Sequence, residues 1–133
     1  MRITPNNIID LKNNEIFVFG SNESGRHGKG AAKTAMKWGA KYGQGKGLQG
    51  KTYAIPTMNA SISNKLKIGK IQMYVNEFIS FAKIHSELIF YVTEIGCGLA
   101  GFNHKEIAPL FQKAIKINNI YLPKKFWRKL NVI

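Results

Sequence analysis

Two short apolar runs in this chain each lead directly into a glycine-rich segment. Residues 15–19 (EIFVF) lead into residues 20–30 (GSNESGRHGKG), and residues 88–93 (LIFYVT) lead, through Glu94 and Ile95, into residues 96–102 (GCGLAGF). An apolar run of this length is typical of a strand buried in a sheet. Because ligands bind at the carboxyl ends of strands in open α/β sheets, we expect both segments, here named the first and the second glycine loop, to face one crevice.

The rest of the chain alternates between helical and strand patterns. Residues 31–38, 66–83 and 103–114 place apolar side chains at helical spacing, and residues 51–55 and 119–123 form two further short apolar runs. The order strand, helix, strand, helix, strand, helix, strand is typical of a layered α/β fold with a largely parallel sheet. A length of 133 residues predicts a single domain over residues 1–133.

Local signals predict where several elements begin and end. Pro56 is expected to end the strand over residues 51–55. Five glycines within residues 39–50 predict a long loop that is mobile or shaped by a ligand. Asn103 and Glu106 have the spacing of a capping box at the start of the third helix, and Pro109 fits that helix only in its first turn.

The charge of the chain is strongly unbalanced. Twenty Lys and Arg residues against seven Asp and Glu residues give a formal net charge of +13 at pH 7. This excess predicts attraction to polyanions or anionic ligands, the alternative being lysines spread over a solvated surface. Residues 124–129 (KKFWRK) combine cations with Phe126 and Trp127, which suits phosphate contact and base stacking in a nucleic acid. We favour the reading that the two aromatic side chains pack this segment onto the core.

The sequence carries no signal for export or membrane insertion. No apolar run approaches the roughly 20 residues that span a bilayer, and the start (MRITPNN) lacks the apolar core of a signal peptide. Cys97 is the single cysteine, which excludes an internal disulfide, and three scattered histidines do not form a metal site. We therefore expect a cytoplasmic protein that binds neither a membrane nor a metal.

The first glycine loop carries groups that suit a phosphate. Gly20, Gly28 and Gly30 allow backbone amides to approach an anion, and Arg26 can donate two hydrogen bonds to it. The spacing is not Gly-x-Gly-x-x-Gly, and Gly30 replaces the Ser or Thr of a P-loop, so dehydrogenase and NTPase types are disfavoured. The alternative is a turn in which glycine is required for a positive φ.

The second glycine loop has a different set of candidate groups. Gly96, Gly98 and Gly101 predict a backbone segment wrapped closely around a ligand. Phe102 is expected either to stack on a ribose or base or to lie in the core. Cys97 would act as a nucleophile only beside a base such as His27 or His104, and we favour a buried, unreactive thiol.

Three polar side chains beside the loops are candidate catalytic residues. Glu23 lies in the first glycine loop and Glu94 directly precedes the second. Either carboxylate is a candidate general base for water. Asn22 is expected to bind a ribose hydroxyl.

Together, residues 18–22, 25–32, 53–57 and 95–102 resemble a family of small phage and bacterial proteins related to macro domains, the ADP-ribose-binding α/β/α modules. The resemblance covers about residues 10–123. It implies a three-layer α/β/α fold with a mostly parallel central sheet, a crevice for ADP-ribose or a related NAD-derived nucleotide, and no bound metal or redox cofactor. The residues it implies as ligand contacts come from both loops: Gly20, Ser21, Asn22, Arg26, His27, Gly28, Gly30, Ala31, Gly96, Cys97, Gly98, Leu99, Ala100, Gly101 and Phe102.

The chain departs from this family at positions that matter for catalysis. In the hydrolase branch an aspartate follows Gly-Cys-Gly-Leu, whereas this chain has Ala100. The catalytic lysine of that branch has no secure counterpart, because Met58 follows the Ile-Pro-Thr segment. The Gly-Asp-Ile-Thr adenine motif is also missing, and Asp10 is an insecure substitute.

Three functions follow from these patterns. The first is binding of ADP-ribose or a related nucleotide between the loops, with Asn22 orienting the distal ribose, and with or without hydrolysis of an ADP-ribosyl bond by water that Glu23, Glu94 or groups of the substrate assist. The second is a basic nucleic-acid-binding protein, which follows from the charge. The third is a phage sponge that holds a signalling nucleotide in the same pocket without turnover.

Overall fold

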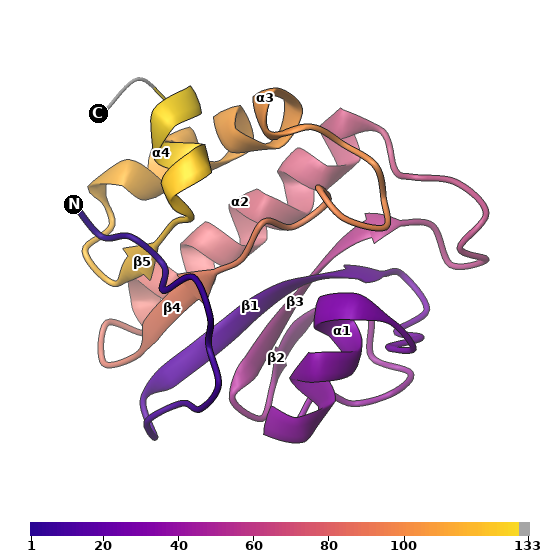
Figure 1. Cartoon of the computed structure of the whole chain (residues 1–133), viewed down its shortest axis with the longest axis horizontal. Helices are drawn as coiled ribbons and strands as arrows, with labels where there is room; N and C mark the ends of the chain where they lie inside the picture. Colours follow the sequence, from indigo (N-terminus) through magenta and orange to yellow (C-terminus); the bar gives the residue numbers. More distant parts are fainter. Residues whose placement is uncertain (131–133) are drawn as a thin grey trace.

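The computed structural model describes residues 1–130 and shows a five-stranded sheet with helices on both faces (Figure 1). β1 pairs in parallel with β3 and with β4, and β4 pairs in parallel with β5, whereas β2 is an antiparallel edge strand. The predicted α/β fold with a mostly parallel sheet is confirmed. In the sheet order, the strands are β2 (Gly47–Gln49), β3 (Thr52–Met58), β1 (Glu15–Asn22), β4 (Ile89–Val92) and β5 (Ile120–Tyr121).

The helical segments follow the predicted order, with two differences. The third predicted helix is divided into a short α-helix and a 3-10 helix, because Pro109 lies at the start of the second part and cannot donate a helical hydrogen bond. A last helix covers a segment for which none was predicted. The segments are α1 (Gly30–Ala35), η1 (Met36–Trp38), α2 (Ile68–Ile84), α3 (His104–Ile107), η2 (Ala108–Lys116) and α4 (Lys124–Lys129).

The capping box predicted at the start of the third helix is confirmed. The Asn103 side chain accepts a hydrogen bond from the Glu106 amide at 3.0 Å, and the Glu106 carboxylate accepts one from the Asn103 amide at 3.1 Å. The helix that follows the second glycine loop therefore begins at a position fixed by its own sequence.

Two predictions for the strands were wrong. Residues 47–49 form β2 rather than part of a loop, since the two-residue turn at Gly50 and Lys51 folds them back on β3. Gly50 has φ +62°, and a Cβ there would lie 2.7 Å from the backbone of Gly39. β3 also continues through Pro56, because β2 pairs only as far as Ala54 and leaves an open edge beyond it, where proline is tolerated.

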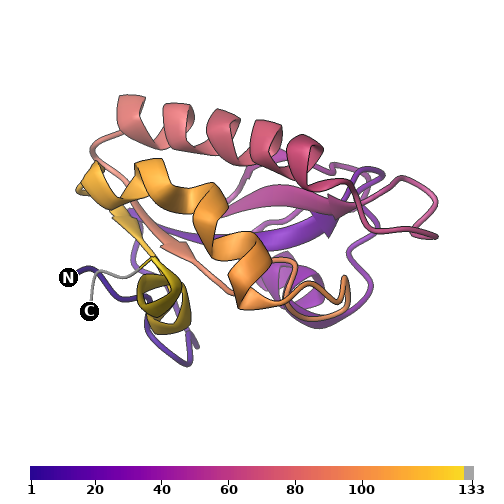
Figure 2. The same ribbon diagram turned by 90° about the horizontal axis from the view of Figure 1, so that it is seen from above.

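The helices lie on opposite faces of the sheet because the direction in which successive strands cross the sheet reverses at β3. From β1 it moves to β3 through α1, and from β3 it returns across β1 to β4 through α2 and continues to β5 through η2. Parallel crossovers are right-handed, so opposite directions of travel place the helices on opposite faces. Figure 2 shows α1 on one side of the sheet and α2 on the other.

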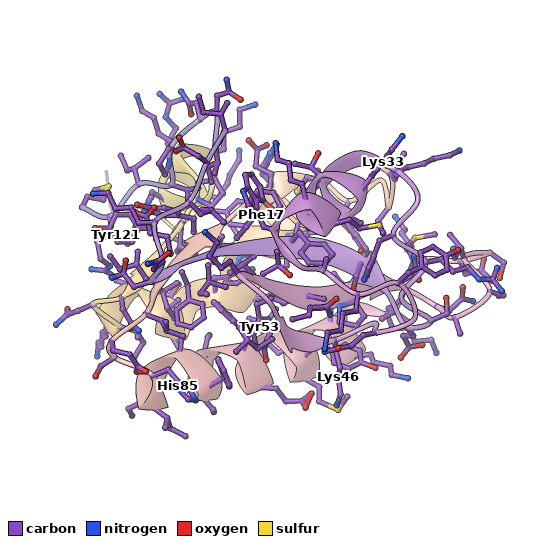
Figure 3. All side chains as sticks on the ribbon, turned by 90° about the horizontal axis from the view of Figure 1, so that it is seen from below. Phe17, Lys33, Lys46, Tyr53, His85 and Tyr121 are labelled. Carbon is purple, nitrogen blue, oxygen red and sulfur yellow. The ribbon has the colours of Figure 1, made fainter. Side chains whose placement is uncertain are left out.

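β1 is buried on both faces, as its nearly continuous apolar sequence predicts. Phe17 and Phe19 belong to a smaller core under α1, whereas Ile16 and Val18 belong to a larger core under α2 and η2. Figure 3 shows Phe17 directed toward α1 and Tyr53 of β3 directed toward α2. Within residues 1–130, no helix is long and apolar enough to cross a membrane.

Candidate functional site

A cleft of about 870 Å³ opens at the carboxyl ends of β1 and β4. The chain leaves β1 on the face covered by α1 and leaves β4 toward the face covered by η2, so this edge is a topological switch point of the sheet. Ligands of open α/β sheets bind at such points. The volume falls within the range of about 300–1,000 Å³ that is usual for small-molecule sites.

Both glycine loops line this cleft, together with the end of β3. Twelve of the residues named from the sequence are among the lining: Gly20, Ser21, Asn22, Arg26, Gly28, Gly30, Ala31, Glu94, Gly96, Gly98, Leu99 and Ala100. The lining also contains seven residues that were not among the candidate site residues named from the sequence: Lys29, Ala32, Thr57, Met58, Ile62, Thr93 and Ile95. Glu23, His27, Cys97, Gly101 and Phe102 are outside the lining.

The two loops approach each other closely at two points. A Cβ built on Gly20 would lie 3.3 Å from the Gly96 amide nitrogen, and one built on Gly30 would lie 3.7 Å from the Leu99 side chain. The expectation that both loops face one crevice is therefore confirmed.

Asn22 shapes the first glycine loop from within. Its Oδ1 accepts hydrogen bonds from the Arg26 amide at 2.8 Å and from the Ser24 hydroxyl at 2.9 Å, and its Nδ2 donates to the Arg26 carbonyl at 3.0 Å. Both lone pairs of Oδ1 are thus used, and one Nδ2 hydrogen is left for a ligand. The Arg26 side chain is exposed, and within the described residues its guanidinium forms no hydrogen bond or ion pair.

His27 lies beneath the first glycine loop rather than in the cleft. It is 1 % exposed, and its ring edge packs on Phe19 with centroids 5.3 Å apart. Its Nε2 lies 3.0 Å from the Gln44 carbonyl and 3.3 Å from the Gln49 side-chain oxygen. Since both neighbours only accept, Nε2 carries the hydrogen and the imidazole ties this loop to residues 44–49.

The glycines of the second loop fall into two kinds. Gly96 has φ +74°, and a Cβ there would lie 3.1 Å from Ile107 and 3.3 Å from Phe102, so the fold itself requires glycine. Gly98 has no positive φ, and nothing lies within 4 Å of its built Cβ. Gly28 in the first loop shares both properties. Packing therefore does not require glycine at positions 28 and 98.

Three consecutive backbone amides of the second glycine loop have no partner among residues 1–130. Around them, the amides of Cys97, Gly101 and Phe102 donate to carbonyls of the same loop region. In the part of the chain that the structure describes, the amides from 98 to 100 donate to nothing. All three of these residues line the cleft. Consecutive free amides of this kind can bind an anion.

Glu94 is the carboxylate residue of the cleft lining. Its Oε1 lies 2.5 Å from Nε2 of His104, the first residue of α3. The Glu94 side chain remains 45 % exposed. The imidazole thus holds one carboxylate oxygen and leaves the other for a ligand or water. Neither Glu94 nor His104 contacts another ionisable side chain among residues 1–130 in an ion pair.

Glu23, the second candidate base, is directed elsewhere. It accepts a hydrogen bond from the Tyr74 hydroxyl at 2.5 Å and pairs with Lys70 at 3.0 Å. These two hydrogen bonds lower the pKa of Glu23. Burial, followed by the bond to Glu23, raises the pKa of Tyr74 to about 12. Glu23 therefore binds the first glycine loop to α2.

Cys97 and Phe102 occupy structural positions. Cys97 is half-buried rather than fully buried. Burial, with smaller contributions from Glu94 and Glu106, raises the pKa of Cys97 to about 11, so the thiol is protonated at neutral pH. Phe102 is 6 % exposed and belongs to the larger core, so its ring is not available to stack on a ligand. Within residues 1–130, no group of His, Cys, Asp or Glu side chains could hold a metal ion.

Ile62 is a cleft residue that the sequence patterns missed. It has φ +59°, and it is the non-glycine residue with positive φ among residues 1–130. The Asn59 side chain organises the loop around it by accepting hydrogen bonds from the amides of Ser63 and Asn64. Such a backbone costs about 1–3 kcal/mol. Asn59, Ser61 and Ser63 signal a turn, but not that the turn borders a cleft.

Comparison with known proteins supports the fold alone. A solved structure of a protein of unknown function from Bacteroides thetaiotaomicron is similar to this chain, with a TM-score of 0.61 and 14% sequence identity. The match covers 86% of this chain and 90% of that chain. No protein-family model and no curated protein matches this sequence.

Proposed function

We propose that this protein binds ADP-ribose or a related NAD-derived nucleotide in the cleft, with the diphosphate between the two glycine loops. The observation that carries the proposal is the convergence of both loops on one cleft at the switch point of the sheet. The resemblance of residues 18–22, 25–32, 53–57 and 95–102 to proteins related to macro domains gives the ligand class and the finer description of the fold as three-layer α/β/α.

The groups around the cleft suit a diphosphate. The free amides from 98 to 100 provide consecutive donors on one side, and Arg26 and Lys29 provide exposed cations on the other. Hydrogen bonds from charged donors to phosphate are about twice as strong as neutral ones. Thr57 and Met58, at the end of β3, also line the cleft.

The free space at Gly28 and Gly98 also supports a bound ligand. Packing does not require glycine at either position, and both residues line the cleft. Glycine at such a position allows the close approach of a ligand to the backbone. A side chain there would occupy the space that the proposal gives to the phosphates.

Hydrolysis, if the protein performs it, depends on Glu94. In that reaction the free carboxylate oxygen of Glu94 takes a proton from a water molecule, and the oxygen of that water attacks the anomeric carbon. The bond from the anomeric carbon to the leaving group breaks, and its electron pair departs with the leaving group. His104 positions the carboxylate through Nε2. Ala100 provides no acid at the position where the hydrolase branch has aspartate. Binding without turnover is the simpler form of the proposal.

Calorimetric titration tests binding. ADP-ribose titrated into the protein should bind, and Arg26→Gln should weaken binding at least tenfold, since a charged hydrogen bond to phosphate contributes about 1.5–3 kcal/mol. Lys33→Gln removes a cation of α1 that is also exposed but lies outside the cleft lining, and it should leave the Kd unchanged (Figure 3). Absence of heat with ADP-ribose, NAD and AMP at millimolar concentration would refute the proposal.

Product analysis separates binding from turnover. Incubation of the protein with ADP-ribosylated peptide and nucleic acid, followed by mass spectrometry, should release free ADP-ribose if Glu94 acts as a base. Glu94→Gln should abolish that release and keep the affinity for ADP-ribose. A protein that binds tightly and releases nothing fits a sponge for a signalling nucleotide.

A further inference from the structure

A second, smaller cavity of about 320 Å³ shares a wall with the cleft. Thr93 and Glu94 line both spaces. On the far side of this wall the lining comes from residues 4–6 and from α4, which contributes three cations: Lys124, Lys125 and Arg128. We name this space the α4 cavity.

The walls of the α4 cavity are held firmly by the core. Thr4 is 5 % exposed, and its hydroxyl donates to the Val92 carbonyl at 2.7 Å. On α4, Phe126 and Trp127 are buried, and the Trp127 indole donates to the Arg2 carbonyl at 2.8 Å. Figure 1 shows the N-terminal segment running beside α4. The aromatic side chains pack the segment on the core, as favoured above, so they cannot stack on bases.

The cations of the α4 cavity are available for a ligand. All three side chains are exposed, and none forms an ion pair or hydrogen bond within residues 1–130. The carboxylate among the lining residues is Glu94, whose Oε1 is already held by His104. The cavity therefore carries an excess of positive charge that only an anionic ligand would offset.

We infer that the α4 cavity binds a phosphate of a polynucleotide chain to which the ADP-ribose group in the cleft is attached. This inference rests on the proposed function and names the substrate class of that site as ADP-ribosylated nucleic acid. A ligand that fills both spaces must cross the wall formed by Thr93 and Glu94. The bond that joins the ADP-ribose group to the polynucleotide would then lie beside Glu94, the candidate base.

A polynucleotide fits this arrangement better than a modified protein. Each nucleotide beyond the attachment point carries a phosphate, whereas a polypeptide carries an anion only where its sequence has an acidic residue. The formal net charge of +13 also attracts the phosphates of the polynucleotide that the three cations do not contact.

The test compares three ligands on three proteins. The ligands are free ADP-ribose, a short oligothymidylate with ADP-ribose on its terminal phosphate, and an ADP-ribosylated peptide. The proteins are the wild type, the variant Lys124→Gln/Lys125→Gln/Arg128→Gln, and a control with the same charge loss, Lys83→Gln/Lys113→Gln/Lys116→Gln. The control residues are exposed on α2 and η2, outside both spaces.

The wild type should bind the modified oligonucleotide at least tenfold more tightly than free ADP-ribose. The α4 variant should lose that preference, with the Kd for free ADP-ribose unchanged within twofold. The slope of log affinity against log salt should fall by about 2, because three phosphate contacts to a single strand are removed. The control variant should keep the preference.

Four results would overturn the inference: no preference in the wild type, an equal loss in the control variant, an unchanged α4 variant, or a modified peptide that binds as tightly as the oligonucleotide. The free ADP-ribose arm separates the two proposals. If the wild type does not bind free ADP-ribose, the proposed function fails. If it binds free ADP-ribose without an oligonucleotide preference, only the inference fails.

Discussion

At the scale of single residues, the two loops contain glycines that serve different needs. Gly96 has a left-handed backbone and lies against Ile107 and Phe102, so replacement strains the fold. Gly98, two residues later, has neither constraint and faces the cleft. The sequence shows only that both positions are glycine, whereas the backbone geometry shows that packing requires glycine at position 96 and not at position 98.

This difference predicts opposite phenotypes at neighbouring positions. Gly96→Ala should lower the free energy of unfolding by about 1–3 kcal/mol, because its φ is positive and its Cβ would meet the core. Gly98→Val should stay within about 0.5 kcal/mol of the wild type, yet weaken ADP-ribose binding at least tenfold. Urea unfolding and calorimetry measure the two quantities.

Gly69 provides the matched control for that experiment. It is also a glycine with nothing within 4 Å of its built Cβ, but it lies on α2, outside the cleft lining. Gly69→Val should leave ADP-ribose affinity unchanged. If Gly98→Val binds ADP-ribose as the wild type does, the second glycine loop does not hold the diphosphate.

At the scale of elements, the sequence predicted those whose signals are local. The apolar runs gave β1 and β4, the stripe over residues 66–83 gave α2, and the Asn103–Glu106 spacing gave the capping box. The two missed elements do not have such a local pattern. β2 exists because Gly50 turns it onto β3, and α4 is held by the burial of its aromatic residues against the core.

The capping box links the stability of α3 to the cleft, because α3 carries His104. Asn103→Ala should lower the free energy of unfolding by about 0.5–2 kcal/mol, the usual cost of losing an N-cap. Asn103→Ser or Asn103→Asp keeps a capping oxygen and should retain most of the stability. Urea denaturation measures this series, and an Asn103→Ala variant as stable as the wild type would show that the cap is dispensable.

At the scale of the whole molecule, the switch point explains why the candidate site lies where it does. The loops after β1 and β4 diverge to opposite faces of the sheet and leave a cleft between them. The alternation of elements predicted this edge of the sheet as the site, and it placed both glycine loops there correctly. The sequence did not predict the contribution of Ile62 or the α4 cavity, because both depend on how distant segments pack.

The measurement that tests the central claim most directly is a structure of the protein determined with bound ADP-ribose. We expect the diphosphate between the two glycine loops, within hydrogen-bond distance of the amides from 98 to 100 and of the Arg26 guanidinium. The backbone of Gly28 should lie in van der Waals contact with the ligand. A nucleotide bound elsewhere on the protein, or one whose diphosphate contacts neither loop, would contradict the account.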